Sequence, residues 1–159
     1  MMQLQAYTNP TRLWLAAAAA AHGDEPEHQQ EGSKDTKARS LRVLIVEDEF
    51  FISLDTKALL QGLGHNVVAI AVSADEAVRV AERERPDLVL MDIRLIGARD
   101  GIDAAAEIHR RFAIRSIFVT ANTDAATRGR AQALAPVAFL EKPLTEPRLR
   151  AGLMALQNK

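Results

Sequence analysis

At 159 residues with an apolar fraction of 48%, the chain has room for one globular domain and a tail. Its formal net charge of −1 lacks the basic excess of a dedicated nucleic-acid-binding protein, so nucleic acid is not an expected partner. The sequence contains no cysteine, which excludes a disulfide framework, a thiolate zinc site and a cysteine nucleophile, and which is compatible with a reducing cytoplasm.

Residues 1–40 differ in composition from the remainder. Leu13-Trp14-Leu15 runs into the alanines of residues 16–21, which predicts an Ala-rich helix. This stretch is too short to span a bilayer, and only one basic residue precedes it, so a signal peptide is the less favoured interpretation and no membrane association is expected. The polar stretch that follows contains glycine and proline and predicts a flexible linker. We therefore predict a helical or disordered extension over residues 1–40 and a folded domain over residues 41–159.

From residue 41 onward, short apolar runs alternate with longer segments of helical periodicity. The runs are brief and rich in Val, Ile and Leu, as buried parallel strands are. They cover residues 41–46, 67–71, 88–91, 117–119 and 137–140. Helical spacing is found in Phe51, Leu54, Ala58 and Leu59, in Ala77, Val78 and Ala81, in Ile102, Ala105, Ala106 and Ile108, and over residues 124–134 and 145–156. This alternation predicts an α/β fold with a doubly wound, five-stranded parallel sheet.

Residues at the expected boundaries agree with this order of elements. Gly62 and Gly64 are placed to close the first helix. Ser73 with Glu76 resembles a capping box at the start of the second helix, and Pro86 interrupts the chain before the third strand.

Acidic residues follow two of the predicted strands. Glu47-Asp48 ends the first apolar run, and Asp92 ends the third. Because the carboxyl ends of parallel strands form the crevice in which open α/β sheets bind ligands, these carboxylates are expected to line one acidic pocket. Thr120 follows the fourth run and Lys142 lies just beyond the fifth, which adds a hydroxyl and a cation to the same edge.

These residue types suit chemistry on a phosphoryl group. A carboxylate can take a phosphoryl group as an acyl phosphate when cations neutralise the charge on the transferring oxygens, and Asp92 is the candidate acceptor. Lys142 is expected to hold one phosphate oxygen as a point charge, and the hydroxyl of Thr120 to donate to another.

A metal ion is the second expected source of positive charge. Mg²⁺ prefers hard oxygen ligands and usually keeps several waters. Asp48 and Asp92, with a backbone carbonyl near Arg94, therefore form the expected magnesium site, and Glu47 is expected to act through water.

From about Leu41 to its end, the chain resembles a response-regulator receiver domain, the phosphorylatable module of two-component signalling. Five motifs fall in the family order: Glu47-Asp48, Asp92, Asp100-Gly101, Thr120-Ala121 and Lys142-Pro143. The resemblance implies the flavodoxin-like strand order 2-1-3-4-5, for which a response regulator is a known example, and a cis bond between Lys142 and Pro143. It also implies that Asp92, Thr120 and Lys142 act together in phosphoryl transfer. Glu47 departs from the family pattern, in which aspartate is the more usual residue.

The resemblance further implies how a signal is received and passed on. A histidine kinase or a histidine phosphotransfer protein would donate the phosphoryl group, and Thr120 and Phe139 would form the switch that responds to it. The output surface would be the face over residues 124–156, and whether that face also forms a homodimer stays open. Only one helix follows Pro143, so a stand-alone cytoplasmic receiver that acts by protein contact is expected. Such a protein catalyses its own phosphorylation and slow dephosphorylation and is not otherwise an enzyme.

Two other functions are compatible with the same residues. The first is a degenerate receiver that binds partners without phosphorylation, and Glu47 is its only support. The second is a phosphatase in which Asp92 is a transient nucleophile. Enzymes of the haloacid-dehalogenase type need a second aspartate two residues after the nucleophile, and here that position is Arg94. Our hypothesis for Arg94 is that its side chain lies across the phosphoryl group and tunes the attack of water.

Overall fold

The computed structural model describes residues 39–121 and 124–157. Strands and helices alternate along the chain in the order β1 (Arg42–Val46), α1 (Phe50–Gly62), β2 (Asn66–Ala71), α2 (Ala74–Glu84), β3 (Leu88–Asp92), α3 (Gly101–Phe112), β4 (Arg115–Thr120), α4 (Ala125–Gln132), β5 (Ala138–Glu141) and α5 (Glu146–Gln157). The chain divides into units of residues 1–36 and 37–159, and all described residues belong to the second. The predicted helix and linker of residues 1–40 lie outside the described residues, except for residues 39 and 40.

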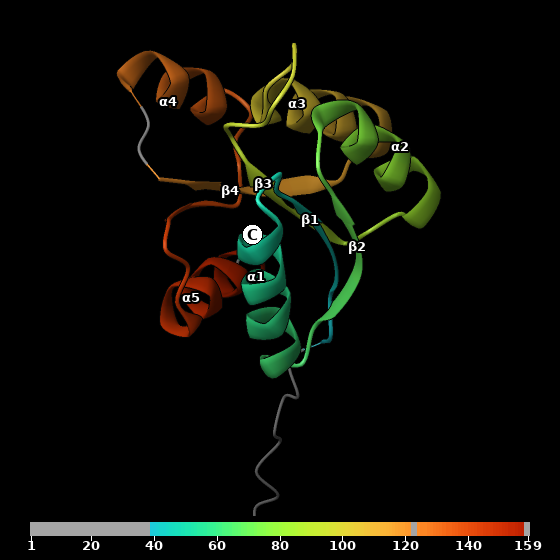
Figure 1. Ribbon diagram of the computed structural model, residues 1–159, viewed down its shortest axis with the longest axis vertical. Helices are drawn as coiled ribbons and strands as arrows, with labels where there is room; N and C mark the ends of the chain where they lie inside the picture. The colour runs from blue at the N-terminus through green and yellow to red at the C-terminus, as the bar shows by residue number, and fades with distance from the viewer. Residues whose placement is uncertain (1–38, 122–123, 158–159) are drawn as a thin grey trace, which may run out of the picture. The chain divides into compact units, whose positions relative to one another are not determined.

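The five strands form one parallel sheet in the order β2-β1-β3-β4-β5, which confirms the predicted topology. Figure 1 shows α1 and α5 on one face of this sheet and α2, α3 and α4 on the other. The strand order reverses between β1 and β3, and such a switch point opens a crevice at the carboxyl ends of the strands. Within the described part of the chain, no helix is long and apolar enough to cross a membrane.

Side chains of the central strands alternate between two apolar layers. Val43 and Ile45 of β1 pack in the layer that contains residues of α1 and α5, whereas Leu44 and Val46 pack in the layer that contains residues of α2 and α3. The same period of two recurs in β3 and β4. All residues of β3 are buried. Burial on both faces explains why the central strands are continuous apolar runs rather than alternating ones.

The predicted capping box of α2 forms with a shifted partner. Ser73 Oγ accepts a hydrogen bond from the backbone N–H of Glu76 at 3.3 Å, as expected. The carboxylate of Glu76, however, accepts from the backbone N–H of Val72 at 2.8 Å, one residue before the cap. At the end of α1 the predicted glycines are confirmed, because the helix ends at Gly62 and Gly64 adopts a φ of 84° in the following turn.

The buried face of α1 is not the one that the apolar spacing suggests. Phe51 and Leu54 recur at helical spacing and mark the helix correctly, but they are 78% and 40% exposed. The helix instead buries Ser53, Thr56 and Leu60 against the sheet. The hydroxyl of Ser53 donates to a backbone carbonyl one turn earlier, so its burial leaves no donor unpaired. The face of α1 that packs on the sheet is therefore not the face that the spacing of its apolar residues indicates.

Candidate functional site

Sheet register brings Glu47 and Asp92 together. Ile45 of β1 pairs with Leu90 of β3, and both side chains pack in the layer that contains residues of α1 and α5. Because side chains alternate along a strand, Glu47 and Asp92, each two residues farther on, are directed to that same side. Both are nearly excluded from solvent, with relative exposures of 4% and 5%. Two carboxylates from separate sequence motifs thus share one buried position at the carboxyl edge of the sheet.

Lys142 compensates this buried negative charge. Its Nζ lies 2.6 Å from Oδ2 of Asp92 and 2.7 Å from Oε2 of Glu47, and its side chain is only 13% exposed. The lysine directly follows β5, where its backbone N–H donates to the carbonyl of Thr120, and its bond to Pro143 is cis, as the resemblance implied. Bonds of this charge-assisted kind are about twice as strong as neutral ones, so the three charged side chains form one unit.

Burial and pairing act in opposite directions on these groups. Desolvation is the largest influence on Glu47 and raises the pKa of its carboxyl group, while the Lys142 hydrogen bond opposes that rise and the negative charge of Asp92 adds to it. Burial alone would lower the pKa of Lys142, but the hydrogen bonds to Asp92 and Glu47 outweigh burial and raise it. The lysine therefore stays charged at neutral pH, which is the state that binds carboxylate or phosphate oxygens.

Glu47, Asp48 and Asp92 form an all-oxygen donor set. Each offers a carboxylate oxygen, and these atoms lie within 4.8 Å of one another. Asp48 is only partly buried, whereas the other two are buried. Hard oxygen donors of this number suit Mg²⁺, which binds through one or two carboxylates and retains water at its remaining positions. The chemistry of the donor set therefore fits the magnesium ion expected from the sequence.

The segment after β3 holds the second oxygen of the candidate acceptor. The backbone N–H of Arg94 donates to Oδ1 of Asp92 at 2.9 Å, while Lys142 holds Oδ2. The side chain of Arg94 is exposed. A metal-binding carbonyl near Arg94 was expected from the sequence, and it stays a prediction.

Thr120 and Phe139 lie on the neighbouring strands β4 and β5. Thr120 ends β4, next to β3 in the sheet, and is 6% exposed. Phe139 of β5 packs against the apolar layer on the α2 and α3 side, with its ring stacked on Phe118 at a centroid distance of 5.6 Å. The guanidinium of Arg128 lies 5.2 Å from the centre of the Phe139 ring. Phe139 is thus partly buried and in contact with α4, and its role as a switch stays a prediction.

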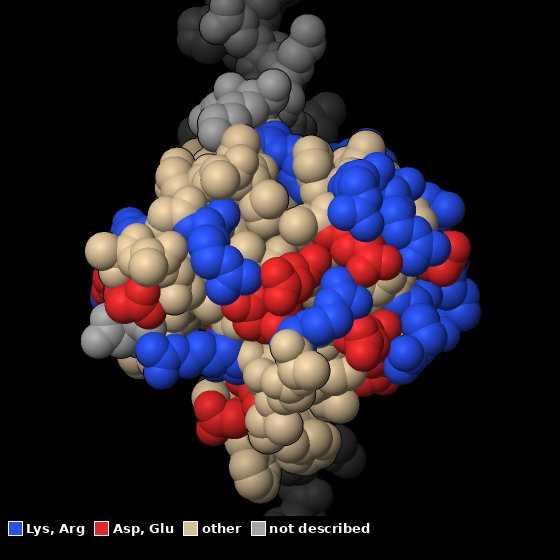
Figure 2. Space-filling view, turned by 90° about the horizontal axis from the view of Figure 1, so that it is seen from above, with Lys and Arg blue, Asp and Glu red and all other residues tan. Residues whose placement is uncertain are grey.

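Sequence reasoning missed an apolar patch on the first turns of α1. We call Phe50, Phe51 and Leu54 the α1 patch; they are 66%, 78% and 40% exposed, and the two rings meet edge to face with centroids 5.6 Å apart. A groove of about 360 Å³ runs along α1, lined on one side by helix residues and on the other by Lys142 and Pro143. Figure 2 shows acidic side chains in the middle of the face seen from above, with Lys and Arg on both sides. Two consecutive phenylalanines directly after acidic residues were the available signal.

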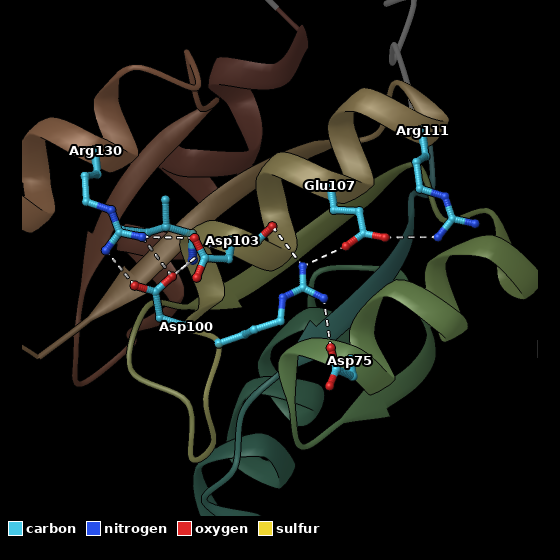
Figure 3. A network of polar contacts seen from close by, with 8 residues as sticks. Asp75, Asp100, Asp103, Glu107, Arg111 and Arg130 are labelled. Atoms are coloured by element: carbon cyan, nitrogen blue, oxygen red, sulfur yellow. Dashed lines mark hydrogen bonds and ion pairs between the residues drawn. The ribbon is translucent and has the colours of Figure 1, made fainter.

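Sequence reasoning also missed Arg99 and Arg130, which join distant elements; Figure 3 labels Arg130 and the acidic partners of both arginines. Arg99, in the loop before α3, pairs with Asp75 of α2 at 2.8 Å and with Glu107 of α3 at 2.7 Å. Arg130 of α4 pairs with Asp100, the residue that caps α3. Arg99 is 24 residues from Asp75 and 8 from Glu107, and Arg130 is 30 residues from Asp100. Pairing rules for residues three or four apart on a helix therefore do not predict these ion pairs.

Comparison with known proteins gives a family match over most of the described residues. The family model of the response regulator receiver domain matches residues 43–154. The phyllosphere-induced regulator PhyR of Methylorubrum extorquens is 45% identical over 80 residues, which are 50% of this chain and 30% of that protein. The transcriptional regulatory protein PdtaR of Mycobacterium tuberculosis is 39% identical over 104 residues, which are 65% of this chain and 50% of that protein. The chain therefore spans half or less of the length of these curated relatives.

Solved structures agree with the family match. The signal receiver domain of a modulated diguanylate cyclase from Desulfovibrio desulfuricans superposes with a TM-score of 0.71 at 35% identity, over 76% of this chain and 96% of that one. A mutant of the anti-anti-sigma factor PhyR from Bartonella quintana gives a TM-score of 0.63 at 30% identity, over 76% of this chain and 51% of that one. Both likenesses extend from the fold to the sequence.

Proposed function

Because the chain belongs to the response regulator receiver domain family, we propose that Asp92 accepts a phosphoryl group from a phosphohistidine donor and that the acyl phosphate switches a protein-binding surface. The contact of Lys142 Nζ with Asp92 and Glu47, at 2.6 and 2.7 Å, carries this proposal. A buried lysine beside a carboxylate places positive charge where the phosphoryl oxygens would come to lie, and such preorganised charge is the main means of stabilising phosphoryl transfer.

The transfer forms a bond between a carboxylate oxygen of Asp92 and phosphorus, and it breaks the P–N bond of the donor. The electron pair of that bond stays on the imidazole nitrogen, which takes up a proton from solvent. Lys142 neutralises one phosphoryl oxygen and the hydroxyl of Thr120 donates to another. Bound Mg²⁺, with Glu47, Asp48 and Asp92 as its protein ligands, would supply the remaining positive charge. Slow hydrolysis of the acyl phosphate returns the protein to its resting state.

The α1 patch is the proposed contact surface for the donor protein. Asp92 is 5% exposed, so a donor imidazole reaches it only from the carboxyl edge, where α1 begins. Phe50 and Phe51 are the most exposed large apolar side chains of that helix, and exposed apolar residues that gather at one place mark interaction surfaces. Phe51→Ser should leave labelling by acetyl phosphate unchanged and slow transfer from a phosphohistidine protein. Equal slowing of both reactions would assign Phe51 to the pocket rather than to docking.

The proposed output is contact with a protein through the face over residues 124–156. The related Bartonella quintana PhyR is described as an anti-anti-sigma factor, a name that itself denotes action on other proteins. Phe139 and Arg128 meet on this face, so a change near Thr120 on the adjacent strand has a short path to it. We also assign the protein to the cytoplasm, where phosphohistidine donors of this signalling class act.

The proposed function is tested by the intact mass of the protein after incubation with acetyl phosphate and Mg²⁺. The wild type should gain one phosphoryl group, and Asp92→Asn, which keeps the shape but not the nucleophile, should gain none. Label that persists in Asp92→Asn would place the acceptor elsewhere.

The same experiment separates the two rival functions. A wild type that gains no mass under conditions that label a known receiver would indicate the phosphorylation-independent binding module. Rapid consumption of acetyl phosphate without accumulation of label would indicate the phosphatase.

A further inference from the structure

Helix α4 is held to the domain by little apolar surface. Among the residues of α4, only Ala131 is buried, whereas α2 and α3 bury five residues each. One buried alanine removes a small apolar area from water, so hydrophobic packing stabilises the position of α4 only slightly. The remaining contacts of this helix must therefore decide where it lies.

Arg130 forms ion pairs between α4 and residues at the start of α3 (Figure 3). Its two terminal nitrogens lie 2.8 Å from Oδ2 of Asp100 and 3.0 Å from Oδ1 of Asp103. Asp100 is itself fixed, because its Oδ1 accepts hydrogen bonds from the backbone N–H groups of Ile102 and Asp103, both at 3.0 Å. A planar guanidinium between two carboxylates, one of them immobilised, is a directional contact rather than a loose surface pair.

Asp100, the carboxylate that pairs with Arg130, is the neighbour of Gly101, which packs against the backbone of the candidate acceptor Asp92. Gly101, next to Asp100, is packed against the backbone carbonyl of Asp92, and its N–H donates to the carbonyl of Ile93 at 3.0 Å. Asp100 is therefore connected to the end of β3 through the close contact of Gly101. This contact offers a short route from Asp92 to the partner of Arg130.

A second arginine of α4, Arg128, contacts Phe139, the aromatic residue of the proposed switch. Arg128 covers the ring of Phe139, which in turn stacks on Phe118 of β4. Within the described residues, α4 is thus held at two points, one leading to β3 and one to β4 and β5.

We propose that the ion pairs of Arg130 with Asp100 and Asp103 form a latch that holds α4 in its resting position, and that phosphorylation of Asp92 weakens this latch. The inference deepens the proposed function and rests on it. By linkage, a contact that is stronger in the resting state must oppose phosphorylation by the same factor as phosphorylation opposes the contact. Removing the latch should therefore loosen α4 and also favour the phosphorylated state.

Hydrogen exchange of the α4 amides in the full, unphosphorylated chain measures the latch directly. Arg130→Gln should speed exchange over residues 125–132 by about threefold, the size expected when exposed ion pairs of this kind are lost. The control is Arg150→Gln, which removes a more exposed arginine–carboxylate pair, with Glu146 on α5 at 2.7 Å. Exchange in Arg130→Gln that equals the wild type, or a speeding that Arg150→Gln reproduces in α4, would refute the latch.

A double-mutant cycle assigns the effect to the pair. Asp103→Asn removes one partner and leaves the capping residue Asp100 intact. Each single variant gives a fold-increase in the exchange rate of the α4 amides. If Arg130 and Asp103 interact, the variant that carries both Arg130→Gln and Asp103→Asn should show a smaller increase than the product of the two single increases. An increase in the double variant equal to that product would show that Arg130 stabilises α4 without its ion pair to Asp103.

Phosphorylation tests the coupling. Labelling with acetyl phosphate and Mg²⁺ should speed exchange over residues 125–132 in the wild type, because the latch is weakened, and should change it much less in Arg130→Gln, in which the latch is already lost. A labelled wild type whose α4 amides exchange at the unlabelled rate would refute the coupling to Asp92. If the wild type takes no label, the proposed function and the coupling both fail.

Discussion

Gly101, the first residue of α3, lies directly against the backbone of Asp92, so that a β-carbon at position 101 would overlap the carbonyl oxygen of Asp92. The Asp100-Gly101 pair of the sequence therefore has two separate tasks. Asp100 caps the helix, and the missing side chain of Gly101 lets the helix approach the end of β3. The position of the candidate acceptor depends on this close approach.

Gly101→Ala should lower the free energy of unfolding by about 2–3 kcal/mol, because the added methyl group meets backbone that cannot rotate away. The control is Gly129→Ala in α4, where an added β-carbon meets no atom within 4 Å. There the substitution should stabilise the protein by about 0.5–1 kcal/mol, since alanine favours the helix. Urea denaturation of the three proteins measures both values. A harmless Gly101→Ala would mean that α3 does not lie this close to β3.

Lys142→Met should lower the free energy of unfolding at pH 7 by about 3 kcal/mol, because it leaves Glu47 and Asp92 buried together without a counter-charge. The control is Lys57→Met on α1, a lysine outside the acidic pocket. Adding Asp92→Asn to Lys142→Met should restore part of the loss, since it removes one of the two stranded charges. Thermal denaturation of the single and double variants tests this expectation. No recovery in the double variant would show that the lysine acts through packing.

Arg94→Ala should speed the loss of the phosphoryl group about threefold, if the arginine side chain lies across the acyl phosphate and obstructs water. Its exposed position beside Asp92 leaves the side chain room to reach over the site. Arg79→Ala, at an exposed position of α2, is the control. The decay of intact mass after removal of acetyl phosphate gives the rates, and matching rates in wild type and Arg94→Ala would refute the role.

The stability of the domain should fall as pH drops below about 6.5, in part through His65. Burial lowers the pKa of His65, and its Nδ1 accepts the backbone N–H of Leu41 at 3.2 Å, which requires the unprotonated nitrogen. The unfolded chain therefore binds a proton that the folded chain resists, and stability is lost between the ordinary pKa and the lower folded value. His65→Asn keeps an acceptor without titrating, so the variant should lose less stability between pH 7 and pH 5. Parallel losses in both proteins, measured by urea denaturation, would exclude His65.

Much of the fold was determined by local sequence pattern. The apolar runs at residues 41–46 and 88–91 predict buried strands because period and composition are local properties, and the structure confirms both strands and their order. The residues of the candidate site were equally visible, since Asp92 and Lys142 each end a predicted strand or follow one closely. Residues at the carboxyl ends of parallel strands lie at the same edge of the sheet, whatever the length of the connecting loops.

What only the tertiary structure decided are the relationships between segments far apart in the chain. The contact of Lys142 with both Asp92 and Glu47 depends on the register of strands that lie far apart in the chain, which no local pattern specifies. The exposure of Phe51 depends on which face of α1 packs on the sheet, and hydropathy alone indicates a different face. The pairing of Arg130 with Asp100 joins residues 30 positions apart. The hydrophobic periodicity of a segment determines whether it forms a helix or a strand. Only tertiary packing determines which face of that helix or strand contacts which other part of the fold.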